Sequence, residues 1–191
     1  MTDTKPEYWN QDLAKGAPGL ALAAIEAART GSTSWGTVNR WATAMVSDPV
    51  IADPACGLYR GAPAVAYTFH CARDPKYAPT LARLDLHIGN ATRTRLDAAH
   101  RRIAAGRLPA MHEYDLISGL TGLGTYFWHR HRGGDLLRDV LLYLVRLAQP
   151  LKIYNEPMPG WWTYDSPSGK PSASWPGGHG NLGIAHGIGV I

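Results

Sequence analysis

Four short segments that open on glycine constrain what this chain can fold into. In each, a Gly is followed three positions later by Gly or Ala and then by small, apolar residues. The segments are Lys15–Leu22, Arg60–Tyr67, Ser118–Thr125 and His179–His186. Their leading glycines recur at intervals of roughly 45 to 60 residues, a period typical of stacked supersecondary units. We therefore expect a repeat-built fold.

Amphipathic helices are predicted between these openings. Apolar residues at helical spacing run through residues 38–45, 81–103 and 137–148. The helices that follow the glycines are instead apolar nearly all round, as in Leu20–Ala28, so we expect them to be buried on all sides. Alternation of the two kinds predicts an all-α fold, an α/α toroid with inner and outer helix rings. An ordinary helical bundle fits the periodicity but not the four repeated openings. No segment alternates as a strand would.

The stretch from Pro150 to Gly180 differs in composition, with six prolines and several aromatic residues. Disordered segments are seldom this aromatic, so residues 150–180 are predicted to form an ordered loop that covers one end of the ring. The chain stops at Ile191, shortly after Gly183 begins a fourth inner helix. We expect residues 1–191 to be the N-terminal part of a single toroid domain.

Composition excludes several classes of protein. The chain is 45% hydrophobic and only 18% charged, which excludes wholesale disorder. The most apolar run, Val140–Ala148, is too short for a membrane span, and residues 1–9 lack the apolar core of a signal peptide. A cytoplasmic protein is therefore expected.

Five arginines and His100 cluster between residues 93 and 107 without interleaved aromatic residues, so we read a solvated helix face and no nucleic-acid site.

The two cysteines, Cys56 and Cys71, are too few for a disulfide framework or a zinc site made of four thiolates. Neither lies in one of the later glycine-led segments.

Three motifs resemble lanthionine synthetase C-like (LanC) proteins. Gly178–Gly187 looks like the family's Gly-rich segment with Ala-His-Gly, Tyr114–Gly122 resembles its Asp-led motif, and Pro159–Trp162 matches a Pro-Gly-Trp-Trp signature of stand-alone bacterial cyclases. The likeness extends over nearly the whole chain from about Asp12, in the right order, and would make this chain the N-terminal half of such a protein.

The resemblance implies an α/α toroid with zinc near one end of its cavity. It also implies an enzyme that joins Cys thiols of a lanthipeptide precursor to dehydroalanine or dehydrobutyrine, which a partner dehydratase makes. The family's zinc ligands are a Cys in Trp-Cys-Tyr-Gly and an adjacent Cys-His pair. Neither segment occurs here, so we expect this chain to bind no zinc itself and to be inactive alone.

Two family active-site positions, Asp115 and His186, fall within the chain. Addition of a thiol to a dehydroamino acid leaves an enolate that must be protonated. An imidazole, whose ordinary pKa is about 6.5, suits that role. We therefore expect His186 to be the general acid and Asp115 to orient it or stabilise its charge. Alternatively, Asp115 caps a helix and His186 is a core residue with its hydrogen bonds satisfied.

Trp161, Trp162 and His179 are candidate substrate-binding residues, although His179 also fits a loop-orienting role or, more weakly, a two-His metal site with His186. Two other functions remain open. An α/α-toroid glycoside hydrolase would use Glu113, Asp115 or Asp165 as acid and base, with the tryptophans as sugar platforms. A non-catalytic LanC-like protein would bind a peptide or small thiol in the same cavity.

Overall fold

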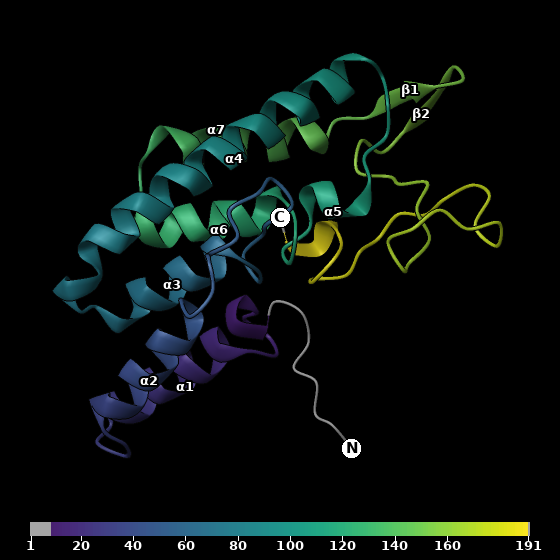
Figure 1. Ribbon diagram of the computed structural model, residues 1–191. Helices are drawn as coiled ribbons and strands as arrows, with labels where there is room; N and C mark the ends of the chain where they lie inside the picture. The colour runs from purple at the N-terminus through teal and green to yellow at the C-terminus, as the bar shows by residue number, and fades with distance from the viewer. Residues whose placement is uncertain (1–8, 191) are drawn as a thin grey trace. The chain divides into compact units, whose positions relative to one another are not determined.

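A computed structural model describes residues 9–190 of the chain (Figure 1). By its internal contacts the chain divides into two compact units, Met1–Gly89 and Asn90–Ile191, with the boundary inside one long helix. The expectation that residues 1–9 form no signal peptide falls mainly on residues 1–8, which lie outside the described residues.

The first unit is built from helices. A short 3₁₀ helix, η1 (Trp9–Gln11), precedes α1 (Ala17–Arg29), α2 (Trp35–Met45) and α3 (Ala62–Ala72); η2 (Pro75–Tyr77) then leads into α4 (Ala78–Ala104). α1 packs against both α2 and α3, around a core that contains Ala24, Ile25, Val38 and Ala72. The small side chains of α1 allow this close packing, as the glycine-led pattern predicts.

The second unit contains the rest of α4, α5 (Met111–Tyr114), α6 (Leu120–Arg130), α7 (Asp135–Leu147) and η3 (Ile188–Val190). α6 packs against α7, and the two helices lie side by side in Figure 1. α7 buries Leu137, Val140, Leu144 and Leu147 along one face, as its helical spacing predicts.

Three of the four glycine openings begin helices. Gly16, Gly61 and Gly119 are the N-caps of α1, α3 and α6. Gly61 is required there, because its φ is +74° and a Cβ would collide with the Cys56 sulfur and the Ile51 carbonyl. α3 is buried nearly all round, but α1 is not, since Leu20 and Glu26 are exposed. The expectation of full burial is therefore wrong for α1.

The fourth opening does not begin a helix. Residues 181–183 are irregular, residues 184–187 form a turn and a bend, and η3 follows. The side-chain oxygen of Asn181 accepts from the Gly183 N–H at 2.8 Å and its carbonyl accepts from the Ile188 N–H at 2.9 Å. Asn favours such local turns over a helix, and each glycine in a helix costs about 1 kcal/mol relative to Ala. The expectation of a fourth inner helix is wrong for the described residues.

A small hairpin also departs from the expectation of no strands. β1 (Leu151–Ile153) pairs antiparallel with β2 (Glu156–Met158). The turn residues Tyr154 and Asn155 both have positive φ, at 51° and 67°, the conformation of a two-residue hairpin turn. The rest of the segment to Gly180 is irregular but ordered by hydrogen bonds, among them the paired backbone bonds between Thr163 and His179.

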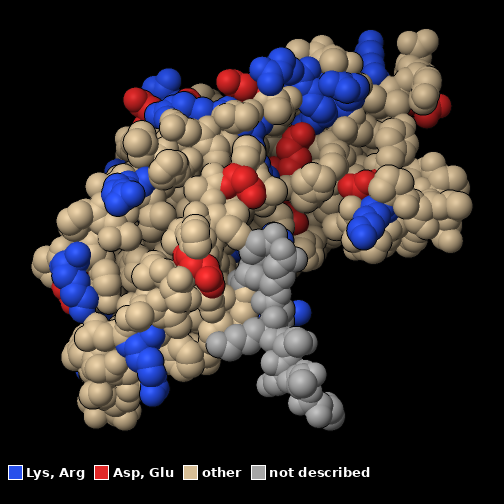
Figure 2. Space-filling model, in the orientation of Figure 1, with Lys and Arg blue, Asp and Glu red and all other residues tan. Residues whose placement is uncertain are grey.

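The arginine cluster is only partly a solvated face. Arg93, Arg101 and Arg107 are exposed, whereas Arg95 is half-buried and Arg102 is buried. Figure 2 shows basic side chains gathered over the region where Figure 1 places the end of α4, with acidic ones nearby. Arg95, Ala99 and Arg102 are spaced as i, i+4 and i+7, which places them on one face of α4. Two arginines of the cluster therefore face inward.

Candidate active site

Asp115 lies in the tight connection between α5 and α6. Its backbone is extended and ends α5, and its side chain is buried. The Oδ1 atom accepts hydrogen bonds from the backbone N–H groups of Ser118 at 2.6 Å and Gly119 at 2.7 Å. Both donors precede α6, whose N-cap is Gly119 without a side-chain cap bond, so Asp115 holds the bend before the helix and does not cap it. Gly119 permits the bend, because a Cβ there would collide with the Tyr114–Asp115 backbone.

The second oxygen of Asp115 contacts His186. The Nδ1 atom of His186 is 2.7 Å from Oδ2 of Asp115, although 71 positions separate the two residues. A backbone hydrogen bond from the Leu116 N–H to the Ala185 carbonyl, 3.1 Å long, holds the two segments together. Asp115 thus holds the bend before α6 and pairs with His186 at the same time, since each contact uses a different oxygen.

This contact fixes the chemistry of the imidazole. An ionised carboxylate only accepts hydrogen bonds, so the proton of the bond must be on Nδ1. The other nitrogen, Nε2, makes no hydrogen bond with the residues that the structure describes, and the His186 side chain is 50% exposed. Such an imidazole can hold or release a proton at Nε2 while the carboxylate stabilises the cation. His186 is therefore not a buried core residue.

The α5 segment that carries Asp115 is anchored by a buried polar network. Glu113 accepts from Arg102 at 2.5 and 3.2 Å, and from the Tyr143 hydroxyl at 2.8 Å. Burial, followed by the nearby Glu113 charge, raises the pKa of Tyr143 well above its ordinary value. Burial also raises the pKa of the adjacent Tyr114 to about 12. Tyrosine hydroxyls here are donors that stay protonated.

Sequence reasoning missed the supporting roles of Arg95, Arg102 and Tyr143. The two arginines were read as part of a solvated cluster, yet their i, i+7 spacing places them beside buried Leu96 and Ala99 on α4. Tyr143 lies on the buried face of α7. A search for polar residues that interrupt an apolar helix face would have found all three.

The three candidate substrate-binding residues lie in the irregular segment after the hairpin. Tyr114 donates its hydroxyl to the Trp161 carbonyl at 3.0 Å, which ties this segment to α5. The indole N–H of Trp162 donates to the Gly177 carbonyl at 2.9 Å. Within residues 9–190 no hydrogen bond joins Trp161, Trp162 or His179 to Asp115 or His186, and their binding role stays a prediction.

His179 has a clear structural environment. Its Nδ1 lies 2.9 Å from the Asp165 carbonyl, which makes Nδ1 the donor. The ring packs against Trp175 with centroids 5.3 Å apart. Its Nε2 is buried and has no hydrogen-bond partner among the described atoms. Asp165 in turn accepts from the Met111 N–H at 3.1 Å, so His179 and Asp165 connect the segment to the start of α5.

The described residues do not supply a metal centre. Nowhere in residues 9–190 do three or more His, Cys, Asp or Glu side chains gather as a metal site would require. The two cysteines are not joined in a disulfide, and burial raises the pKa of both thiols. No helix of this part of the chain is long and apolar enough to cross a bilayer.

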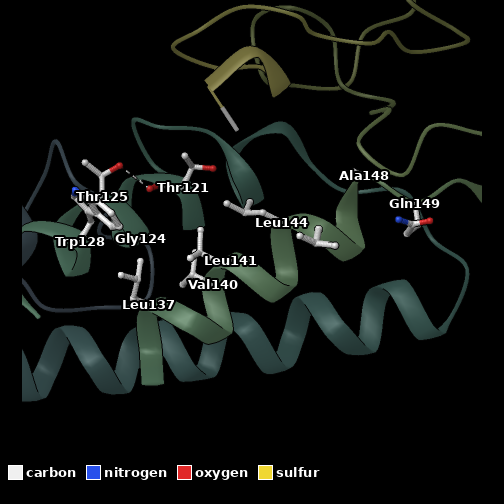
Figure 3. A pocket seen from close by; sticks show the side chains of 11 residues that line it. Thr121, Gly124, Thr125, Trp128, Leu137, Val140, Leu141, Leu144, Ala148 and Gln149 are labelled. Atoms are coloured by element: carbon white, nitrogen blue, oxygen red, sulfur yellow. Dashed lines mark hydrogen bonds between the residues drawn. The ribbon is translucent and has the colours of Figure 1, made fainter. Parts of the chain in front are cut away.

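A separate apolar groove of about 520 Å³ runs along α6 and α7. Figure 3 shows the side chains of Leu137, Val140, Leu141 and Leu144 on α7, with Thr121, Gly124, Thr125 and Trp128 on α6. No titratable side chain lines the groove. It is therefore a packing surface rather than a place for proton transfer, and the candidate chemistry is at Asp115 and His186.

Comparison with known proteins places this geometry in context. Residues 7–191 match the family described as lanthionine synthetase C-like protein. Among solved structures the chain is similar to nisin cyclase, with a TM-score of 0.71 and 22% sequence identity over 96% of this chain. The chain spans 46% of that protein. No curated protein matches the sequence. The structural likeness confirms the expected all-α toroid class of fold.

Proposed function

This chain belongs to the lanthionine synthetase C-like family, and from that premise we propose that it contributes to the formation of thioether rings in a ribosomally made peptide. In the proposed reaction the Cys thiol of a lanthipeptide precursor adds to dehydroalanine or dehydrobutyrine. The observation that carries the proposal is the contact between Asp115 and His186, 2.7 Å long. It supports an acid that can protonate the product of addition.

The reaction needs one proton transfer at carbon. The thiol loses its proton to solvent, the sulfur bonds to the β-carbon of the dehydroamino acid, and the electrons of the carbon–carbon double bond move to form an enolate. A proton then returns to the α-carbon, so the peptide gains the thioether without net gain or loss of protons. We assign delivery of this proton to Nε2 of the His186 imidazolium. Solvent reaches the half-exposed ring and reprotonates it.

Asp115 supports this role in two ways. Its carboxylate accepts from Nδ1 and so directs Nε2 away from the contact. Its own position is fixed by the N–H groups of Ser118 and Gly119, which keeps the ring of His186 in one orientation. Preorganisation of this kind makes proton transfer faster, because no rearrangement is needed during the reaction.

Zinc in this family supplies the thiolate, because coordination of sulfur lowers the pKa of the thiol. The residues present do not fit a zinc site: within residues 9–190 no group of three candidate ligands exists, and both cysteines have raised pKa values. We assign no step of the proposed chemistry to zinc at these residues.

The partners follow from the same proposal. A precursor peptide is the substrate, and a dehydratase must supply its dehydroamino acids. Trp161, Trp162 and His179 are proposed to shape the segment that receives the peptide. The bonds from Tyr114 to Trp161 and from the Met111 N–H to Asp165 support this, since they fix the segment to α5 beside Asp115. His179 is held in the segment by the Asp165 carbonyl.

The glycoside hydrolase alternative has no geometric support. Glu113 is paired with Arg102 and Tyr143, Asp115 with His186, and Asp165 accepts from the Met111 N–H. The ionisable partners of Glu113 and Asp115 make these two carboxylates poor candidates for a sugar-cleaving pair.

The test is cyclisation of a dehydrated precursor by the product of the whole gene. His186→Asn is expected to lower kcat by about 10² to 10⁴-fold, the usual contribution of a general acid. Asp115→Asn is expected to lower kcat less, because His186 loses the carboxylate that orients its ring but is itself still present as the acid. Ring formation is followed by mass spectrometry after alkylation of the remaining thiols.

His129→Asn is the matched control, since His129 lies at the exposed end of α6, and its rate should equal the parent rate. Cyclisation by His186→Asn at the parent rate would remove His186 from the chemistry. Peptide binding without ring formation by the parent would favour the non-catalytic LanC-like alternative.

A further inference from the structure

Arg95 donates hydrogen bonds to the backbone of the α5–α6 connection both before and after Asp115. This half-buried side chain of α4 donates from Nη1 to the Ser118 carbonyl at 2.7 Å and from Nη2 to the His112 carbonyl at 3.1 Å. The two carbonyls lie before and after Asp115 in the chain. A guanidinium group can bridge them because its N–H groups are held in a rigid, planar fork.

One of these bonds reaches Asp115 through a single peptide group. The Ser118 carbonyl and the Gly119 N–H belong to the same peptide unit, and that N–H donates to Oδ1 of Asp115 at 2.7 Å. A cation at the carbonyl polarises the peptide and strengthens the bond that its N–H makes. Asp115 then passes the effect to Nδ1 of His186 through Oδ2.

We propose that Arg95 is a positioning residue for the Asp115–His186 pair. It holds the loop at His112 and Ser118, fixes the carboxylate through the Ser118–Gly119 peptide, and so keeps the proton of neutral His186 on Nδ1. Nε2 is thereby reserved for the proton that the reaction needs. This inference rests on the proposed function for its purpose, but the geometry behind it concerns the pair alone.

The other inward arginine of α4 acts elsewhere. Arg102 binds Glu113 and the Arg107 carbonyl, and none of its hydrogen bonds reaches the peptide that holds Asp115. Arg102 therefore anchors α5, whereas Arg95 acts on the loop that follows. Replacement of Arg95 by a neutral side chain removes the positive charge at the Ser118 carbonyl.

The experiment measures the tautomer of His186 in the 191-residue chain by ¹⁵N nuclear magnetic resonance of the imidazole. Spectra are recorded over a series of rising pH values, and the tautomer ratio is taken where the imidazole ¹⁵N signals no longer change with pH, which is the range of the neutral ring. In the parent protein the Nδ1–H tautomer should dominate. In Arg95→Met and Arg95→Gln its ratio to the Nε2–H tautomer should fall by about twofold or more, since the carboxylate is less well held.

Arg93→Met is the matched control. Arg93 lies on the same helix, is exposed, and donates to Asn90 of its own helix, so this variant loses the same charge without touching the loop. Its tautomer ratio should equal the parent ratio. Urea unfolding of each variant reports whether it folds. Arg95→Gln keeps a polar side chain of similar reach in case Arg95→Met does not fold.

Several results would overturn the inference. These are an unchanged tautomer ratio in a folded Arg95 variant, an equal change in Arg93→Met, or failure of both Arg95 variants to fold, which would assign Arg95 to stability. Cyclisation by the product of the whole gene separates the two proposals. If the tautomer shifts as expected but the parent forms no rings, the positioning role stands and the proposed function fails.

Discussion

At the scale of single residues, Asp115 shows how one side chain can serve structure and chemistry together. Oδ1 accepts from two backbone N–H groups just before α6, and Oδ2 contacts His186. Holding the bend does not need the second oxygen, and orienting His186 does not need the first. The sequence offered a structural and a catalytic role as alternatives because it does not reveal which atoms of a side chain are used.

Replacement of Tyr143 by Phe is expected to destabilise the protein by about 1.5 to 3 kcal/mol, the usual worth of a hydrogen bond to a charged group. The hydroxyl of Tyr143, a fully buried residue, donates to Glu113 at 2.8 Å. Urea unfolding measures the change. Tyr154→Phe is the control, since Tyr154 is 95% exposed and its stability should match the parent. Equal stabilities for Tyr143→Phe and the parent would contradict the role of this network.

The raised pKa of Tyr114 predicts that the stability of the protein depends on pH in the alkaline range. Burial raises its folded-state pKa from 10.0 to about 12, so the unfolded chain releases this proton at lower pH than the folded chain does. Stability should be unaffected by Tyr114 below about pH 10 and should fall as pH rises from there to about 12, because the unfolded state then binds fewer protons. Tyr143, whose pKa is also raised, acts in the same direction.

Urea unfolding of the parent and of Tyr114→Phe, at a series of pH values from about 9 to 11.5, measures this effect. The Phe variant should lose stability with pH less steeply than the parent. Identical slopes would show that the Tyr114 hydroxyl ionises equally well in the folded protein.

At the scale of elements, the connection between α5 and α6 depends on a close approach of two backbone segments. Gly119→Ala would push a Cβ into the backbone of Tyr114 and Asp115. We expect a loss of about 1 to 3 kcal/mol in unfolding free energy, as is usual for a steric conflict at a buried position. The His186 tautomer ratio should also shift, since Asp115 moves. Gly177→Ala is the control because open space surrounds Gly177. A Gly119→Ala variant as stable as this control would refute the packing argument.

The helices themselves follow their sequence patterns to different degrees. Spacing at 3.6 residues predicts α2, α4 and α7, and the glycine openings mark the starts of α1, α3 and α6. The same opening fails at Gly180, where Asn181 forms a local turn. A glycine-led pattern allows close packing but does not enforce a helix, because glycine is itself a poor helix former.

At the scale of the whole molecule, the groove along α6 and α7 leaves apolar side chains in contact with water. Leu141 and Val145 are 49% and 64% exposed, and both line the groove. Exposed apolar surface of this kind promotes association. Val145→Glu is therefore expected to reduce both binding of the dye ANS and self-association in analytical ultracentrifugation, with stability within about 0.5 kcal/mol of the parent.

Leu142→Glu is the control that distinguishes an effect of the groove from the effect of removing any exposed apolar side chain. Leu142 is 54% exposed on the same helix but does not line the groove, so its effect on dye binding should be smaller. Equal effects of the two substitutions would mean that the groove itself has no special role.

The sequence by itself determined the class of fold, the positions of most helices and the two residues of the candidate acid pair. These depend on local spacing and on short motifs, which the chain carries wherever it folds. Only the tertiary structure decided that Oδ2 of Asp115 meets Nδ1 of His186, that Arg95 and Arg102 turn inward, and that the last glycine opening forms a turn. Those outcomes depend on which distant backbone and side-chain groups come within hydrogen-bonding distance, and no local pattern encodes that.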